Sequence, residues 1–175
     1  MRELYKPFLK ELPAAGHILD AGCGSGREAE AFLERGYRVT AIDASPEMAQ
    51  SATVLTGQHC EILSFQKMEF YEEFDGIWAC ASLLHVPKHE MADVMHRFIR
   101  SLKVDGIFYI SLKEGEGERI AEDGRFFNYY TMESFRELLA DFPMLGEVAA
   151  WKTQGIRSQR NIVTWLNFLL KKVSE

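Results

Sequence analysis

The sequence predicts an α/β fold, in which an open and mostly parallel sheet carries helices on both faces. Three observations support this prediction. Strand-like and helix-like stretches alternate along most of the 175 residues. Residues 74–86, FDGIWACASLLHV, are almost continuously apolar, as in a central parallel strand that is covered on both faces. The last two strand-like stretches follow one another without a helix, which predicts an antiparallel pair at one edge of the sheet.

The first half of the chain begins with an amphipathic helix within residues 1–16. Gly36 is expected to end the next helix, because glycine tolerates the left-handed backbone of a C-terminal cap. Ser45 is expected to cap the helix after that, with Pro46 at its first position, where a missing N–H costs nothing. The predicted elements are strands at 17–20, 37–43 and 60–63 and helices at 27–35 and 45–57.

The second half continues the alternation, and Thr131 is expected to cap its last helix. A polar, glycine-containing segment at 113–124 interrupts the pattern, and a loop at 154–160 joins the last two strands. We find no repeat, low-complexity tract or linker, so residues 1–175 are interpreted as a single domain. The predicted elements are strands at 74–86, 107–112, 146–153 and 161–172 and helices at 89–106 and 132–141.

Composition and charge narrow the class of protein. A net charge of −6 disfavours a nucleic-acid partner, because proteins that bind polyanions usually carry a basic surface. The chain contains no apolar run of about 18 residues and no secretory signal, so we expect no membrane partner. Its three cysteines lack metal-ligand spacing, which favours reduced thiols, no metal site and a cytoplasmic location. The sequence leaves open whether the chain is a monomer or a homodimer.

The most informative stretch is HILDAGCGSGREAEAF at residues 17–32, where a strand ends in an acid and three glycines alternate before a helix. The spacing G-x-G-x-G differs from the G-x-G-x-x-G of dinucleotide-binding turns, because Arg27 stands where the last glycine of that pattern would be. The Gly-Lys-Ser/Thr of phosphate-binding loops is absent as well. The carboxylate of Asp20 would repel a pyrophosphate and attract a cation, so the turn favours a ligand with positive charge.

A second acid, Asp43, ends the next predicted strand, 23 residues after Asp20. A carboxylate at this place can accept hydrogen bonds from both hydroxyls of a ribose. Together the two strand ends suggest a nucleoside with a cationic tail. S-adenosylmethionine has these features, since it combines adenosine with a sulfonium and an ammonium.

The stretch ILDAGCGSG followed by YRVTAIDAS resembles the class I S-adenosylmethionine-dependent methyltransferases. The resemblance continues through FDGIWACASLLHV and LKVDGIFYISLK and covers about residues 15–115. Within the family, the chain is similar to small bacterial methyltransferases of the tellurite-resistance and ubiquinone-biosynthesis type. The resemblance implies a Rossmann-like, doubly wound and mostly parallel seven-stranded sheet with a C-terminal antiparallel hairpin strand. It also implies S-adenosylmethionine as cofactor and methyl transfer to a small-molecule substrate.

The resemblance further implies cofactor-binding roles for residues at the carboxyl ends of the strands. The glycines of the turn would let the backbone approach the cofactor, and the acid of the second strand would bind the ribose hydroxyls. The candidates are Asp20, Ala21 and Gly22 at the methionine part, Gly24 and Gly26 in the turn, Asp43 at the ribose, Ala44, Met48, Phe65 and Gln66 at the adenine, and Ala81 near the sulfonium. The family often has an acid where Phe65 and Gln66 stand, and this chain lacks it.

Methyl transfer requires alignment of the acceptor and exclusion of water, and it requires a base only where the acceptor must lose a proton. His85 follows the fourth strand, where the methyl group is expected to point, and an imidazole can take a proton near pH 7. A structural histidine that binds the backbone is the alternative. Pro87 lies between His85 and His89, which disfavours a single helix that presents both to a metal.

The segment 113–130 is the candidate wall of the substrate site, because it follows a strand end and combines glycines with aromatic residues. Tyr129 is expected to face the site and to act in catalysis, with core packing as the alternative. Lys113 and Arg125 are candidates to bind an acidic substrate, with surface solvation as the alternative. Trp165 is expected to cover the sheet.

Other functions stay open at this point. An RNA-modifying methyltransferase would use the basic loop with Lys152, Arg157 and Arg160 as its footprint, although the net charge counts against it. A solvated hairpin tip is the structural alternative for that loop. A non-catalytic S-adenosylmethionine-binding protein would have an occupied or collapsed substrate pocket. A nicotinamide-dependent oxidoreductase is disfavoured by Asp20 and Arg27.

Overall fold

A computed structural model describes residues 2–157 and 161–174 of the chain. The strands of its main sheet are β1 (His17–Ala21), β2 (Arg38–Asp43), β3 (Cys60–Ile62), β4 (Phe74–Cys80), β5 (Leu102–Lys113), β8 (Leu145–Arg157) and β9 (Asn161–Lys172). The helices are α1 (Arg2–Lys10), α2 (Arg27–Leu33), α3 (Pro46–Thr56), α4 (Lys88–Ser101) and α5 (Met132–Leu139). Within the described ranges, no helix combines the length and the apolar character that a membrane crossing requires.

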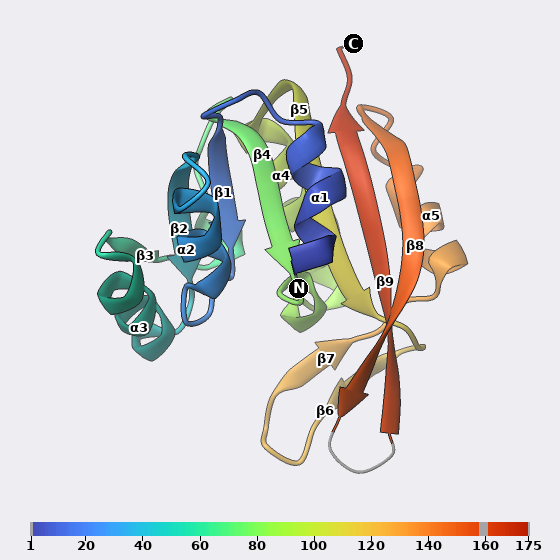
Figure 1. The fold of residues 1–175 in the computed structure, drawn as a ribbon. Helices are drawn as coiled ribbons and strands as arrows, with labels where there is room; N and C mark the ends of the chain where they lie inside the picture. The colour runs from blue at the N-terminus through green and yellow to red at the C-terminus, as the bar shows by residue number, and fades with distance from the viewer. Residues whose placement is uncertain (1, 158–160, 175) are drawn as a thin grey trace.

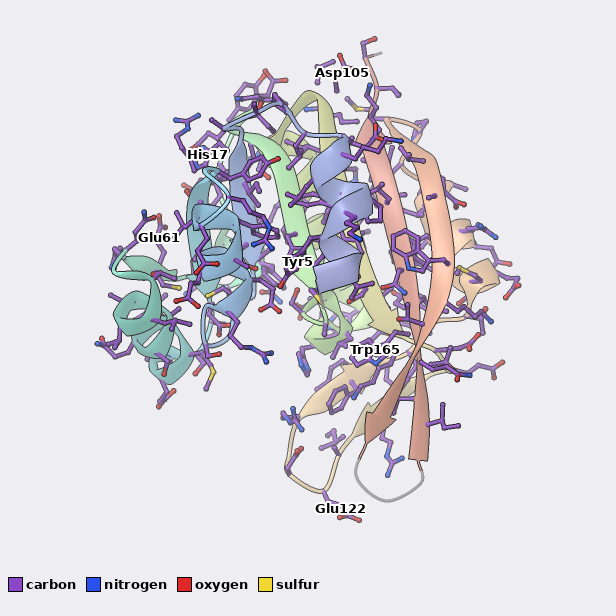
Figure 2. All side chains as sticks on the ribbon, in the orientation of Figure 1. Tyr5, His17, Glu61, Asp105, Glu122 and Trp165 are labelled. Atoms are coloured by element: carbon purple, nitrogen blue, oxygen red, sulfur yellow. The ribbon has the colours of Figure 1, made fainter. Side chains whose placement is uncertain are left out.

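The seven strands lie in the order β3-β2-β1-β4-β5-β9-β8. The first five run parallel, and β9 runs antiparallel to both of its neighbours. The carboxyl ends of the parallel strands therefore meet at one edge of the sheet, the lower edge in Figure 1. In Figure 2, Trp165 lies toward this edge, whereas His17 and Asp105 lie toward the opposite one. The predicted doubly wound sheet with a C-terminal antiparallel strand is confirmed.

Helices cover both faces of the sheet, with α1 and α2 on one face and α4 and α5 on the other (Figure 1). On the α1 face, the ring of Trp78 stacks on Tyr109 with centroids 3.9 Å apart, and Tyr5 meets Trp78 edge-on. On the other face, the buried rings include Phe98 of α4 and Phe135 of α5. Burial of these aromatic side chains removes apolar area from water on both faces, which holds the layers together.

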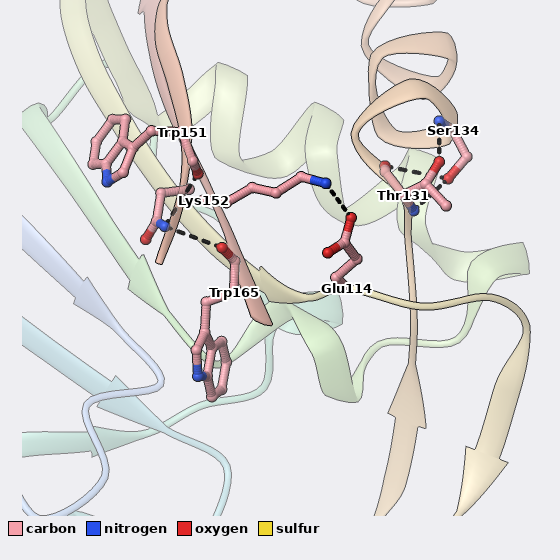
Figure 3. A network of polar contacts seen from close by, with 7 residues as sticks. Glu114, Thr131, Ser134, Trp151, Lys152 and Trp165 are labelled. Carbon is pink, nitrogen blue, oxygen red and sulfur yellow. Dashed lines mark hydrogen bonds and ion pairs between the residues drawn. The ribbon is translucent and has the colours of Figure 1, made fainter. Parts of the chain in front are cut away.

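The two predicted N-terminal caps are confirmed, whereas α2 ends at Leu33 with Glu34 as its C-cap, two residues before the expected Gly36. The Ser45 hydroxyl accepts the N–H of Met48 at 3.3 Å, and Pro46 is the first residue of α3. The Thr131 hydroxyl accepts the N–H of Ser134 at 3.1 Å, and the Ser134 hydroxyl accepts the N–H of Thr131 in return (Figure 3). Both caps satisfy N–H groups that the first helical turn leaves without partners.

Two predicted elements extend at least five residues past their observed ends. The helix predicted at 89–106 ends at Ser101, and a strand follows at once. The apolar run at 74–86 is a strand only as far as Cys80, after which the chain forms a short 3-10 helix, η2 (Leu83–His85). A continuous apolar run shows burial, but it does not distinguish a strand from a buried turn.

A small hairpin, β6 (Glu118–Ile120) paired with β7 (Phe126–Asn128), was not predicted from the sequence. Its first strand lies in the segment 113–124, for which no element was predicted. The hairpin projects beyond the carboxyl edge of the sheet, beside the far ends of β8 and β9 (Figure 1). The loop predicted at 154–160 is partly strand, because β8 continues to Arg157, and residues 158–160 lie outside the described part of the chain.

Candidate functional site

The glycine turn joins β1 to α2 at the carboxyl edge of the sheet. Gly22, Gly24 and Gly26 have φ angles of +73°, +55° and +87°, which glycine adopts without strain. The N–H groups of Gly22 and Cys23 both donate to the carbonyl of Ile42, at 2.9 and 3.0 Å. These bonds fix the turn to the end of β2 and so define its backbone conformation.

The three glycines differ in what a side chain would meet. A Cβ atom at Gly22 would lie 2.5 Å from the Cβ of Ser82, and one at Gly26 would lie 2.8 Å from the Cα of Ala52. Packing therefore requires glycine at both positions. A Cβ atom at Gly24 would meet nothing within 4 Å. Gly24 thus presents bare backbone to open space, as expected where a ligand approaches the chain closely.

Asp43 ends β2 beside this backbone. One of its carboxylate oxygens accepts the N–H of Gly24 and the other accepts the N–H of Ser45, both at 2.9 Å. These two bonds orient the side chain, and each oxygen keeps a lone pair for a donor from a ligand. Two adjacent hydroxyl groups, as in a ribose, match a carboxylate held in this way.

A cavity of about 570 Å³ adjoins the turn and the ends of β2, β3 and β4; we call it the cofactor cavity. Its volume is within the range of small-molecule sites. Eight of the cofactor-binding residues expected from the sequence line it: Gly22, Gly24, Asp43, Ala44, Met48, Phe65, Gln66 and Ala81. These residues come from four separate segments that meet only in the folded chain.

Asp20, Ala21 and Gly26 are not among the residues that line the cofactor cavity. Asp20 is 2% exposed, and its carboxyl lies near the backbone N–H of Ala29 in the first turn of α2, which partly offsets the rise in its pKa. Burial, and next the nearby carboxyl of Glu28, raise the pKa of Asp20 well above its usual range. Its Oδ2 atom is buried without a hydrogen-bond partner. The structure therefore places this acid beneath the turn, where it supports the start of α2.

Several residues of the cofactor cavity were not predicted from the sequence to bind the cofactor. Ser82 is the most informative, because it is 7% exposed and its hydroxyl is buried without a hydrogen-bond partner. Its position directly after Ala81 at the end of β4 was a signal that could have found it. Arg125, a candidate from the sequence for binding an acidic substrate, comes from the connection between β6 and β7 and also lines the cofactor cavity. The others are Ser45, Leu63, Ser64 and Val86.

A second cavity of about 300 Å³, which we call the acceptor cavity, lies beside the first and next to the ends of β4, β5 and β9. Ala81, His85 and Arg125 line both cavities. Ala81 has a φ of +55°, unusual for a residue other than glycine, and its N–H donates to the Ser111 hydroxyl at 2.8 Å. The remaining lining residues are Leu84, Lys113, Phe127, Gly155, Val163 and Trp165, so this tryptophan borders a cavity rather than only the sheet.

His85 stands where the two cavities meet. Its Nδ1 atom lies 2.7 Å from the carbonyl oxygen of Phe126. A carbonyl only accepts, so Nδ1 carries the proton in the neutral ring and Nε2 keeps a lone pair. Burial is the main cause that lowers the pKa of His85, and the charges of Arg125 and Lys113 lower it further. The imidazole is therefore neutral near pH 7 and can accept a proton at Nε2.

Tyr129 lies at a third hollow, which it lines with Lys113, Glu114, Ile162, Val163 and Thr164. It does not line the cofactor cavity or the acceptor cavity. Lys152 donates to a carboxylate oxygen of Glu114 at 2.5 Å, so this part of the predicted basic loop forms an ion pair (Figure 3). The side chains of Arg157 and Arg160 fall outside what the structure describes.

The polar and apolar groups of the cofactor cavity fit S-adenosylmethionine. The open backbone at Gly24 admits a ligand, and the carboxylate of Asp43 suits the ribose. The Ser82 hydroxyl needs a polar partner, while Met48 and Phe65 offer apolar surface to a purine. In the part of the chain that the structure describes, no group of three or more His, Cys, Asp or Glu side chains is placed to hold a metal ion.

The sequence also matches a family model described as a methyltransferase domain, over residues 19–110. Among curated proteins, an uncharacterized methyltransferase from Staphylococcus carnosus is 29% identical over 139 residues, which are 78% of this chain and 66% of that protein. The match to a second curated relative, from Bacillus subtilis, covers 42% of that protein's length. The chain therefore spans about half the length of the curated relatives that it matches.

Solved structures share the fold. An S-adenosylmethionine-dependent methyltransferase from Methanosarcina mazei has a TM-score of 0.87 and 20% identity, with 98% of this chain and 99% of that chain covered. The 1,6-didemethyltoxoflavin-N1-methyltransferase from Burkholderia thailandensis, with 1,6-didemethyltoxoflavin and S-adenosylhomocysteine bound, has a TM-score of 0.74 and 23% identity. That match covers 99% of this chain and 82% of the Burkholderia chain.

Proposed function

This chain belongs to the methyltransferase domain family, and we propose that it transfers a methyl group from S-adenosylmethionine to a small-molecule acceptor. The observation that carries the proposal is the cradle formed by Gly24 and Asp43. The backbone of Gly24 faces open space. The carboxylate of Asp43 accepts hydrogen bonds from two backbone N–H groups. This arrangement suits a nucleoside that must lie close to the chain.

The chain would bind the cofactor with the adenosine toward β2 and β3 and the reactive end toward β4. Asp43 would accept hydrogen bonds from the ribose, and Phe65 and Met48 would pack against the adenine. Ala81 and Ser82 stand at the end of β4, beside the acceptor cavity. When bound, S-adenosylmethionine supplies its methyl group from a sulfonium, and the methyl passes to the acceptor as the sulfonium becomes the neutral thioether S-adenosylhomocysteine.

The chain's own contribution is to orient the acceptor and to remove its proton. The acceptor cavity meets the cofactor cavity at Ala81, His85 and Arg125, so an acceptor atom placed there lies at the border of both. Where that atom carries a proton, Nε2 of His85 takes it, because Nδ1 is committed to the carbonyl of Phe126. The leaving group needs no proton, so no acid is required.

A small acceptor is supported by the size of the acceptor cavity, about 300 Å³, which is at the lower end for small-molecule sites. The Burkholderia relative, which binds 1,6-didemethyltoxoflavin, shows that this fold can serve a small acceptor. An RNA acceptor has less support, because Lys152 is paired with Glu114 and the net charge is −6. Cytoplasmic residence, which reduced thiols favour, stays part of this proposal.

Replacement of Asp43 tests the cofactor site. Asp43→Ala should weaken binding of S-adenosylmethionine more than about tenfold, or about 1.4 kcal/mol, in a calorimetric titration. Glu61→Ala is the matched control, because it removes the same charge from the neighbouring strand at a residue that does not line the cavity. A loss of less than twofold in Asp43→Ala, or an equal loss in both variants, would contradict the proposed ribose contact.

Replacement of His85 tests the proton acceptor. His85→Asn keeps a donor for the carbonyl of Phe126 but has no basic nitrogen. Affinity for S-adenosylhomocysteine should stay within twofold, while turnover of an acceptor that must lose a proton should fall about 10²–10⁴-fold. The wild-type rate should decline as the pH drops below about 6.5, and the variant should lose this decline. Unchanged turnover with an unchanged pH profile would show that His85 is structural.

A further inference from the structure

We propose that the acceptor cavity selects a small planar anion, whose acidic group pairs with the ammonium of Lys113. This inference rests on the proposed function, since it names the class of acceptor for the same site. Three features of the cavity support it: the position of its cations, the absence of acids from its described lining, and the two aromatic rings that border it.

Lys113 is the last residue of β5, and its partner across the sheet in β9 is Trp165. The lysine is only 9% exposed. Its ammonium lies 3.8 Å from the ring centroid of Phe127 and 5.8 Å from that of Trp165. The two aromatic side chains and the lysine all line the acceptor cavity, so a cation is held in its wall between rings.

A second cation, Arg125, borders the same cavity. Its guanidinium carbon lies 5.4 Å from the ring centroid of Phe127. Its Nε and Nη2 atoms donate to one oxygen of Asp123 at 2.9 and 2.6 Å, in an ion pair that is about half exposed. Exposure weakens such a pair, so the arginine still adds positive potential to the cavity.

The described lining of the acceptor cavity carries two cations and no acid. None of the described residues that line it is an aspartate or a glutamate. The acid next to Lys113 in the chain, Glu114, is paired with Lys152 (Figure 3) and does not line the cavity. Asp43 belongs to the cofactor cavity. The same positive field acts on His85, where Arg125 and Lys113 both lower the pKa after the main effect of burial. Binding of an anion in the cavity is therefore electrostatically favourable, and binding of a cation is unfavourable.

The shape of the cavity favours a flat molecule. The rings of Phe127 and Trp165 border it, and Gly155 leaves room for the indole, because a Cβ atom there would lie 3.0 Å from its Nε1 atom. Aromatic faces bind planar groups by stacking. With the acidic group at Lys113, the rest of the molecule reaches His85, where the cavity meets the cofactor cavity.

Three probes of one shape and different charge test this inference. Benzoate is a planar anion, benzamide its neutral counterpart and benzamidine its cationic counterpart. Each is titrated into the full chain loaded with S-adenosylhomocysteine, and binding is followed by ligand-observed NMR. Benzoate should bind at least about tenfold more tightly than benzamide, and benzamidine more weakly still. Equal affinities, or no binding of benzoate at about 10 mM, would overturn the proposal.

A pair of lysine variants tests the position of the acidic group. Lys113→Gln should remove the preference for benzoate over benzamide and leave affinity for S-adenosylhomocysteine within twofold. Lys152→Gln is the matched control, because it removes the same charge from an ion pair outside the cavity, and it should keep the preference. If Lys113→Gln does not fold, Arg125→Gln replaces it, since this side chain is about half exposed. It should reduce the preference at least about threefold.

The controls separate this inference from the function on which it rests. Absence of S-adenosylhomocysteine binding to the wild-type chain would refute the proposed function itself. Normal binding of S-adenosylhomocysteine without a preference for benzoate would refute only the anionic acceptor. Lys113→Gln that loses affinity for S-adenosylhomocysteine but keeps the benzoate preference would place the lysine at the cofactor, and that result would also overturn the inference.

Discussion

A methyl group added at Gly24 meets open space, whereas one added at Gly26 meets the backbone of α3 at 2.8 Å. Alanine at the two positions should therefore cause different defects. Gly57→Ala is a control for backbone strain alone, because Gly57 has a φ of +68°, has nothing within 4 Å of an added Cβ and ends α3 away from both cavities. We expect Gly24→Ala to impair cofactor binding and Gly26→Ala to impair stability.

The expected size of the stability effect follows from two contributions. Alanine in the left-handed region costs about 1–2 kcal/mol, which applies to all three variants. At Gly26 the added Cβ would also lie 2.9 Å from the Cβ of Ala52, and overpacking of this kind costs about 1–3 kcal/mol more. A chain of this size loses about 2–4 °C per kcal/mol, so Gly26→Ala should melt about 2–12 °C below Gly57→Ala. Gly24→Ala should have the same melting temperature as Gly57→Ala.

Thermal denaturation without cofactor measures the stability effect, and calorimetric titration with S-adenosylmethionine measures binding. Gly24→Ala should bind at least about tenfold more weakly than the wild-type chain, because its Cβ occupies space beside Asp43 that the cofactor needs. Gly57→Ala should bind within twofold. The reasoning is refuted if Gly26→Ala melts together with Gly57→Ala, or if Gly24→Ala keeps the wild-type affinity.

Three further predictions concern buried groups. The pKa of Asp20 is raised by burial and by Glu28, so its contribution to stability is complete below about pH 4 and is lost as the pH rises. In urea denaturation, Asp20→Asn should match the wild-type chain near pH 4 and exceed it increasingly toward pH 8; a constant difference would contradict the raised pKa. Burial raises the pKa of Cys80 to about 11, so iodoacetamide at pH 8 should modify it far more slowly in the folded chain than in urea, and equal rates would contradict its burial. The hydroxyl of Tyr109 donates to Oδ1 of Asn167 at 2.7 Å. Tyr109→Phe should therefore lower the unfolding free energy by about 1–3 kcal/mol. No change in the unfolding free energy would show that Oδ1 of Asn167 finds another donor.

The sequence was sufficient to predict the cofactor cavity where its residues adjoin strand ends. Gly22 and Gly24 come directly after β1, and Asp43 is the last residue of β2. Local sequence patterns are therefore enough to locate them. The rule that carboxyl ends of parallel strands meet then brings them together. The orientation of Asp20 was beyond this reasoning, since it depends on how α2 starts over the end of β1.

Lys113 and Arg125 were candidates from the sequence for binding an acidic substrate, but the cavity that brings them together was harder to predict, because long-range pairing builds it. Lys113 faces Trp165 only through the antiparallel register of β5 and β9. Arg125 arrives on a hairpin whose strands have three residues each, too short for a recognisable pattern of alternation. Tyr129, expected to face the site, follows β7 and lines a separate hollow, a placement that depends on how the hairpin packs and not on a local pattern.

The most direct test of the central claim is a calorimetric titration of the purified chain with S-adenosylmethionine, S-adenosylhomocysteine and NAD in parallel. The open backbone at Gly24 beside the carboxylate of Asp43 predicts micromolar binding of both sulfur nucleosides and none of NAD. Binding of NAD, or of neither sulfur nucleoside, would contradict the account of the glycine turn and of the methyltransferase activity built on it.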